Sequence, residues 1–552
     1  MNTAVITGVG CSPSSKISSD KITNFSDISE LFTHSNCSAI EDNQNCSWCT
    51  SLMSIEETET YKNPRLCSFI CLARNSIKES GVNVDENTYL VLVWQKHNLP
   101  VGATNLTTDK YILRKEYLQQ NVSAYPRILS SLLKIGGGSI VVDDISSAME
   151  IANLLISQQK TNVVLVGCDT AFFVVEELQL AEKREAKIYC KLPEVENVSD
   201  DKKAKVVISS VGVVSPLGVG VDANLKALHS GCVGVAKIEK FECDNWAGCV
   251  VGQNGAVAYT LEASREALKN TKDLNSKNID FICCSEQRSV VNKADLSDKL
   301  GIDGNVKSLK SGLNAGLQGL EYAKMLLENC KSKQVVVVAC DELTKSKMEL
   351  YSALKYFRSD ESEKDFQMKY YSAYRTVFGE GASAFLLETL DETTSSCSNQ
   401  KYLGEILSCV STLDGGNYTD ANLDNDGLQR AFQKAIKQAG VSVKDVDLIS
   451  WSPRGTAQDS KIINLRDKFF GKIPMITSVF HTGYSECSSA LMSLGCLLES
   501  LNQDKGLWRQ RFGIVYFDDV VLERSPKIVV ALATSHTGGN YVIIVKINKK
   551  NI

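Results

Sequence analysis

A histidine and three cysteines near the start of the sequence have a spacing that could bind a metal ion. They are His34, Cys37, Cys46 and Cys49. Four ligands of this kind can hold zinc in a tetrahedral structural site. Further along the chain, a similar pair, Cys243 and Cys249, is separated by five residues, a spacing that is poor for a zinc hairpin. We therefore expect buried cysteines in a repeated, strand-rich region, with no bound metal and no cofactor.

A second segment of interest is 310–320, which reads KSGLNAGLQGL. Leucine and methionine residues continue beyond it at close to helical spacing, and four consecutive valines follow at 335–338. The spacing indicates a helix, and the valine run is typical of a buried strand. We predict a helix that leads into a core strand, with 310–320 at the centre of any functional site.

The elements around this segment occur more than once. Residues 4–13 (AVITGVGCSP) and 206–216 (VVISSVGVVSP) have the pattern of one strand and turn, and 163–169 (VVLVGCD) matches 335–341 (VVVVACD). Matches in the same order predict duplication of a unit of about 200 residues, which is longer than the repeats of solenoid proteins.

Two polar stretches divide the chain. Residues 194–205 and 391–401 have the composition of linkers. We therefore predict three pieces, 1–198, 205–392 and 400–552.

Length and composition exclude several classes of protein. At 552 residues the chain exceeds one ordinary core. The net charge of -5, without a lysine and arginine cluster, argues against nucleic acid. No segment reaches the roughly 18 uncharged apolar residues of a membrane helix, and the first residues are typical of a strand and not of a signal peptide. We expect a cytoplasmic protein with reduced cysteines.

Five motifs, in order along the chain, resemble the β-ketoacyl synthases of the thiolase superfamily. They are the opening 206–218, Gly-Glu-Gly-Ala at 379–382, Arg454-Gly455-Thr456 in place of His-Gly-Thr, Gly483-Tyr484 in place of Gly-His, and SHTGGN at 535–540. The resemblance implies an α/β, thiolase-like layered αβαβα fold. Its N-terminal half would be 205–392, its C-terminal half 400–552, and 1–198 would be an additional degenerate N-terminal half-domain that has lost its partner half.

The catalytic residues of that family are missing at the matching positions. The family uses a cysteine thiolate to carry the acyl chain, two histidines to assist decarboxylation and enolate formation, and a lysine near them. The cysteine position holds Leu313 or Asn314, depending on the anchor chosen for the match. The histidine positions hold Arg454 and Tyr484, and the lysine position holds Val479. The resemblance thus implies no catalytic residues of the usual kind.

Other side chains could carry relocated chemistry. His481 and His536 lie close in sequence to the missing histidines, and Cys487 offers a thiol. A shift of three residues on a rigid site moves an imidazole too far, so we do not expect a histidine to substitute. In the first piece, Ser146 is a candidate hydroxyl nucleophile, although we prefer to interpret it as a helix cap.

The resemblance implies a non-catalytic subunit similar to the chain-length factors. Such subunits pair as heterodimers with an active ketosynthase in type II fatty acid, polyketide or polyene biosynthesis, which also allows contact with acyl carrier protein. An acyl transferase or hydrolase with a relocated nucleophile, or a scaffold protein of thiolase-like fold, remains the alternative. We expect neither nucleic acid nor a membrane as a partner.

Overall fold

The computed structural model describes residues 3–11, 63–94, 124–168, 171–195, 204–243, 245–252, 255–269, 279–285, 291–312, 315–353, 376–390, 402–414, 426–508, 525–535 and 538–548. The chain divides into two compact units. Unit 1 is formed chiefly by Met1–Asp201, and unit 2 chiefly by Lys202–Val410 and Ala421–His536. The finer division into 1–198, 205–392 and 400–552 stays a prediction.

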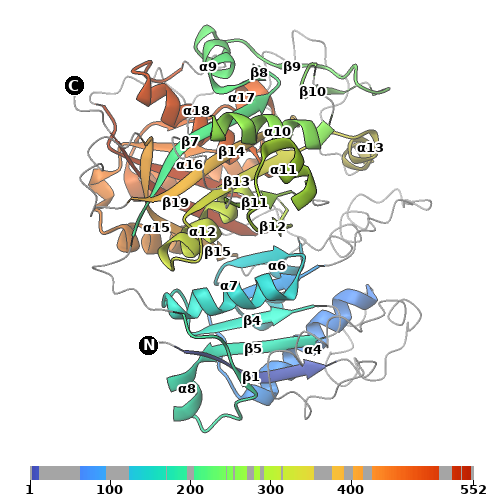
Figure 1. The fold of residues 1–552 in the computed structure, drawn as a ribbon, viewed down its shortest axis with the longest axis vertical. Coiled ribbons are helices and arrows are strands. Elements are labelled where there is room, and N and C mark those ends of the chain that lie inside the picture. The colour runs from blue at the N-terminus through green and yellow to red at the C-terminus, as the bar shows by residue number, and fades with distance from the viewer. Residues whose placement is uncertain are drawn as a thin grey trace. The chain divides into compact units, whose positions relative to one another are not determined.

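Unit 1, coloured blue to cyan in Figure 1, is a sheet with helices packed against it. Its strands are β1 (Ala4–Cys11), β2 (Tyr89–Val93), β3 (Ser139–Val142), β4 (Val163–Gly167), β5 (Ala171–Glu177) and the short β6 (Cys190–Lys191). β2 pairs in parallel with β3 and β4, whereas β5 pairs antiparallel with β4 and β1. The order is therefore β3-β2-β4-β5-β1, and parallel neighbours require the helical crossovers that join them.

Unit 2 contains the same arrangement twice in the part of the chain that the structure describes. The strands of its first half are β7 (Lys205–Ser215), β8 (Gly218–Val219), β9 (Val235–Lys237), β10 (Trp246–Gly248), β11 (Asp280–Cys284), β12 (Val306–Leu309), β13 (Gln334–Asp341) and β14 (Gly381–Leu390). Those of its second half are β15 (Gly404–Leu413), β16 (Leu448–Trp451), β17 (Met475–Ile476), β18 (Ile528–Thr534) and β19 (Gly539–Ile547). The two orders are β12-β11-β13-β14-β7 and β17-β16-β18-β19-β15.

The helices of unit 2 complete a five-layered fold. They are α9 (Val221–Ser230), α10 (Gly255–Leu268), α11 (Lys293–Leu300), α12 (Ala315–Glu328), α13 (Lys345–Ala353), α15 (Asp426–Ala439), α16 (Ala457–Phe470), α17 (Val479–Thr482) and α18 (Ser489–Asn502), with the 3-10 turn η6 (Val443–Asp445). α12 and α18 are buried almost all round, and α18 contacts strands of both sheets. α10 and α11 pack on the first sheet, and α15 and α16 on the second. The predicted thiolase-like αβαβα architecture is confirmed.

Unit 1 has the helices α4 (Pro64–Ser80), α6 (Tyr125–Leu133), α7 (Ile145–Ser157) and α8 (Leu178–Lys183). α4 and α6 pack against Leu90, Leu92 and Val141, which share one face of the sheet. Burial of these aliphatic side chains supplies the main stabilisation of the unit. No helix among the described residues of the chain is long and apolar enough to span a membrane.

Side-chain contacts support the duplication predicted from the sequence. In unit 1 the hydroxyl of Thr7 donates to the carboxylate of Glu176 on the neighbouring strand. In unit 2 the hydroxyl of Ser209 donates to Glu388 at the corresponding place. Each pair crosses from the first strand of the motif to the fifth, so the two units share a contact as well as a strand order.

The start of α7 corrects one prediction. The N-cap of this helix is Asp144, whose carboxylate accepts a hydrogen bond of 2.7 Å from the backbone N–H of Ser147. Ser146 lies within the first turn and is exposed. The interpretation of Ser146 as the helix cap is therefore wrong, because the extended residue that can reach the free N–H groups is two positions earlier.

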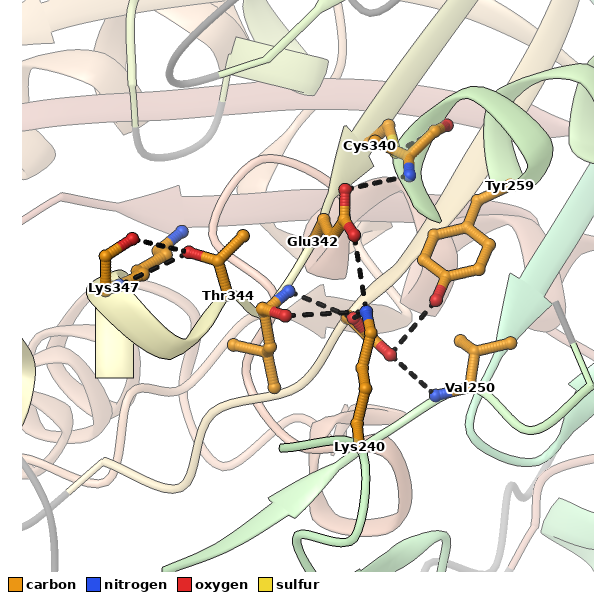
Figure 2. A network of polar contacts seen from close by, with 11 residues as sticks. Lys240, Val250, Tyr259, Cys340, Glu342, Thr344 and Lys347 are labelled. Carbon is orange, nitrogen blue, oxygen red and sulfur yellow. Dashed lines mark hydrogen bonds and ion pairs between the residues drawn. The ribbon is translucent and has the colours of Figure 1, made fainter. Parts of the chain in front are cut away.

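The entrance to β14 is held by a buried carboxylate, Glu380, which is fully buried. Its oxygens accept hydrogen bonds from the N–H of Val250 (3.0 Å), the hydroxyl of Tyr259 (3.1 Å) and the N–H of Leu343 (2.9 Å), and an ion pair joins it to Lys240 (3.0 Å). Figure 2 shows Lys240 reaching into this network, where it also contacts Glu342.

In this network the positive charge of Lys240 lies beside the negative charges of Glu380 and Glu342. Burial lowers the pKa of Lys240, but Glu380 and Glu342 outweigh burial, so the pKa is raised. Burial and the charge of Glu380 raise the pKa of Tyr259, which keeps the phenol protonated as a donor. The glutamate of the Gly-Glu-Gly-Ala motif thus ties three segments of the first half together.

We predict that Glu380→Gln lowers the free energy of unfolding by about 3 kcal/mol, because a buried cation and several donors lose their charged acceptor. The matched control is Glu342→Gln, whose side chain is 32% exposed and which should cost less than about 1 kcal/mol. Urea unfolding of both variants gives the comparison. Equal losses would contradict the role given to Glu380.

Limited proteolysis tests the proposed boundary. The polar segment 194–205 should be cut first, since a charged linker has little buried backbone to protect it, and a stable C-terminal fragment of about 350 residues should remain. Mass spectrometry of the fragments locates the cut. Early cleavage inside β7 would mean that the second piece does not begin there.

Candidate functional site

The positions matched to catalytic histidines lie at one edge of the second sheet. β16 pairs in parallel with β17 and β18, so the carboxyl ends of these strands share an edge. Arg454 follows the end of β16, and Val479 and Tyr484 follow the end of β17. In open α/β sheets, ligands bind outside the carboxyl ends of the strands. The topology therefore brings Arg454, Val479 and Tyr484 into the region where this class of fold places its chemistry.

Three other predicted positions cannot be placed. Leu313 and Asn314 precede α12, and His536 follows β18, but all three lie outside the described residues. The same holds for the proposed zinc ligands His34, Cys37, Cys46 and Cys49. Within the residues that are described, no group of three or more histidine, cysteine or acidic side chains could hold a metal ion.

Tyr484 is buried and held by its backbone. Its N–H donates to the carbonyl of Val377 (2.8 Å), and its carbonyl accepts from the N–H of Gly379 (2.9 Å). The ring is tilted against Phe378, with centroids 6.5 Å apart. Burial raises the pKa of the phenol far above its usual value, despite an opposing effect of Arg454. Tyr484 is thus a neutral hydrogen-bond donor at any physiological pH.

Arg454 lies in a loop that Asp459 holds in place. The carboxylate of Asp459 accepts from the N–H groups of Arg454 (3.2 Å), Gly455 (2.7 Å) and Thr456 (3.0 Å). Burial raises the pKa of Asp459, while the charge of Arg454 and the three amides oppose that rise. A carboxylate at the start of α16 also interacts favourably with the helix dipole. The backbone at Arg454 is therefore fixed by a short local motif.

Asp341, at the end of β13, joins the two halves of unit 2. Its Oδ2 accepts from the N–H of Cys487 (2.8 Å) and from the N–H (2.9 Å) and hydroxyl (3.0 Å) of Ser488. The thiol of Cys487 is fully buried and donates to the carbonyl of Gly312 (3.1 Å). The turn between Tyr484 and α18 is thereby fastened to the segment that leads into α12.

A buried ion pair lies next to this turn. Lys347 of α13 pairs with Glu486, and their side chains are 6% and 3% exposed. The hydroxyl of Tyr351 donates to the other oxygen of Glu486 (2.5 Å), and the ring of Tyr351 stacks on Phe378 with centroids 4.5 Å apart. The cluster of Lys347, Tyr351 and Glu486 connects α13 to the Tyr484 turn. Sequence analysis missed it, and no local pattern could have revealed it.

The candidates for relocated chemistry that the structure describes lie in different surroundings. His481 is fully buried, and its Nδ1 lies 2.7 Å from the carbonyl oxygen of Cys232, which requires a proton on Nδ1. Ser146 belongs to unit 1 and is exposed. The thiol of Cys487 contacts a carbonyl, which cannot act as a base for it. Val479 is a buried apolar side chain.

Comparisons with known proteins agree with this fold. No protein-family model matches the chain. The putative polyketide β-ketoacyl synthase 1 of Streptomyces cyaneus is 22% identical over a region covering 47% of this chain and 75% of that protein. A type II polyketide ketosynthase in complex with its acyl carrier protein, and the ishigamide ketosynthase/chain length factor, each have a TM-score of 0.53 and 18% identity, covering 63% of this chain and 100% of theirs.

These likenesses define the class of protein. The chain has the mixed α/β, thiolase-like fold of the ketosynthases. Its sequence is also similar to that of a β-ketoacyl synthase over about half of the chain. At the carboxyl edge of the second sheet, the described side chains include an arginine, a tyrosine and a valine.

We predict that Lys347→Met alone costs about 3–5 kcal/mol of stability, because Glu486 would remain buried without its cation. Adding Glu486→Leu should recover much of that loss, since no uncompensated charge is left. Urea unfolding of the two single variants and the double variant measures the coupling. Losses that simply add would show that the pair is not an interacting unit.

Proposed function

We propose that this chain is a non-catalytic, chain-length-factor-like subunit of the β-ketoacyl synthase class. In this proposal it pairs with an active ketosynthase in type II fatty acid, polyketide or polyene biosynthesis, in the cytoplasm. The fold provides the support for the class, and the side chains at the site provide the support for inactivity.

The observation that carries the proposal is the chemistry of Arg454, Val479 and Tyr484. A protonated phenol and a guanidinium cannot take up a proton as an imidazole does, and a valine carries no charge. All three are at least nine-tenths buried, so water cannot readily supply the missing proton transfer. Without imidazoles, decarboxylation and condensation lose their acid and base groups.

The proposed partners follow from what similar proteins bind. One structural relative is a ketosynthase in complex with its acyl carrier protein, and another is described as a ketosynthase/chain length factor. A subunit of the same fold can occupy the second place in such a pair. Contact of this chain with acyl carrier protein is the weaker part of the proposal, because no described surface of the chain identifies that contact.

The two alternatives have less support. An acyl transferase or hydrolase would need a nucleophile next to a base. The thiol of Cys487 donates to a backbone carbonyl, and Ser146 is exposed in unit 1. A scaffold protein would use the fold only for assembly. A scaffold protein would be inactive as well. It would differ from a chain-length-factor-like subunit only in leaving the products of an active ketosynthase unchanged.

Mass spectrometry and reconstitution test the proposal. The purified chain, incubated with acyl- and malonyl-carrier protein, should form no acyl adduct. Co-expressed with an active ketosynthase, it should co-purify as a stoichiometric complex and change the length or yield of the product. The matched control is Leu313→Cys, which should remain inactive, because Arg454 and Tyr484 still cannot replace two imidazoles.

Two results would reject it. A stoichiometric adduct that disappears when one cysteine or serine is replaced would favour the relocated enzyme. Identical products with and without the chain, together with a monomeric chain at micromolar concentration, would favour the scaffold.

A further inference from the structure

Arg454 is a buried cation that forms no ion pair among the described residues, although its charge acts on the nearby carboxylate of Asp459. It is 7% exposed. Its backbone N–H bonds to Asp459, but the structure's described contacts give its guanidinium no hydrogen bond and no ion pair, and its Nε is fully enclosed. A buried charge is normally paired, since leaving water without compensation costs several kcal/mol. The exception at Arg454 therefore calls for an explanation.

A second unsatisfied donor belongs to Tyr484. This residue is 3% exposed, and its hydroxyl has no hydrogen-bond partner in the part of the chain that is described. Its pKa is sensitive to the charge of Arg454, which shows that the two groups are electrostatic neighbours. They also follow adjacent parallel strands, β16 and β17. Two donors that lack acceptors among the described residues thus follow neighbouring strands at one edge of the second sheet.

The acidic residues nearby are already engaged. Asp459 accepts from three backbone amides, and Asp341 accepts from the turn at Ser488. Glu486 is neutralised by Lys347 and bonded to Tyr351. None of these carboxylates forms an ion pair with Arg454 in the described contacts. No carboxylate among the described residues therefore serves as a hydrogen-bond acceptor for the guanidinium of Arg454.

We propose that Arg454 and Tyr484 form a binding site for the carboxylate group of a small-molecule ligand. A guanidinium presents a planar fork of N–H donors that matches a carboxylate with two parallel hydrogen bonds, and a phenol can donate a third. A neutral ester or amide would leave the positive charge of Arg454 uncompensated, so the site should discriminate by charge. Binding requires no covalent step.

This site is independent of pairing with a ketosynthase, since the ligand binds the chain itself. The proposed site also explains why Arg454 and Tyr484 stand at the two positions where the similar family has histidines. Both side chains are hydrogen-bond donors suited to a bound anion. The adjoining ring of Phe378 and the buried Val479 suit an aliphatic chain attached to the carboxylate.

The test uses the full chain, with octanoate and malonate as the two carboxylate probes and octanamide as the neutral control. Calorimetry and thermal unfolding should show binding of at least one carboxylate and none of octanamide. Arg454→Met and Tyr484→Phe should each weaken that binding by about 10-fold or more, the usual effect of losing a hydrogen bond to a charged group. A preference for octanoate would indicate an acyl-chain ligand, and a preference for malonate a short dicarboxylate.

The unliganded protein provides a second measurement. Arg466 is equally buried, but it donates to the carbonyl of Ile473 and forms an ion pair with Asp467 (2.6 Å). Arg454→Met should therefore lower the unfolding temperature much less than Arg466→Met does. If Arg454→Met lowers the temperature as much as Arg466→Met does, or if no carboxylate binds at millimolar concentration, the proposal is wrong. Should Arg454→Met fail to fold, the proposal is equally wrong, because the arginine would then be satisfied without a ligand.

Discussion

One oxygen of Asp341 fixes the geometry on which the candidate site depends. It accepts three hydrogen bonds from Cys487 and Ser488, at the point where the Tyr484 turn enters α18. The carboxylate comes from a strand of the first half of unit 2, whereas the turn belongs to the second half. Negative charge at the N-terminus of a helix is favourable, and here it is supplied by a distant part of the chain. The orientation of the two halves and the position of the turn are therefore set by the same contact.

Other buried carboxylates of unit 2 also accept hydrogen bonds or form ion pairs with several groups. Glu380, Asp459 and Glu486 each have their oxygens matched by amide, hydroxyl or ammonium donors. A buried carboxylate is tolerated only when its charge is satisfied, so each of them fixes several segments at once. This framework does not require any particular side chain at positions 454 or 484. The residues that would perform chemistry can change while the polar framework that supports them persists.

Local patterns in the sequence predicted much of the fold. The valines at 335–338 lie within β13, and the repeated segment 206–216 contains most of β7, because burial and turn signals act over a few residues. Contacts between distant residues left no such signal. Lys347 and Glu486 are 139 positions apart, and Lys240 and Glu380 are 140 apart. Ser146 was misjudged for a related reason, since Asp144 and Ser146 could each have capped α7 and only the extended backbone conformation of Asp144 decides between them.

The strand order also explains how copies of one motif can diverge. Each of the three sheets in the described part of the chain has three neighbouring parallel strands, and a helix follows the strand at the outer edge of these three. In unit 1 that helix is α7, and its free N–H groups are satisfied by its own Asp144. A helix end that is capped internally has lost its capacity to hold an external anion. In unit 2 the segment after β16, a parallel strand of the second sheet, instead carries the buried Arg454, whose Nε has no hydrogen-bond partner among the described residues. Unit 1 thus satisfies this helix end from within, whereas unit 2 leaves a buried donor of Arg454 without an acceptor among its described residues.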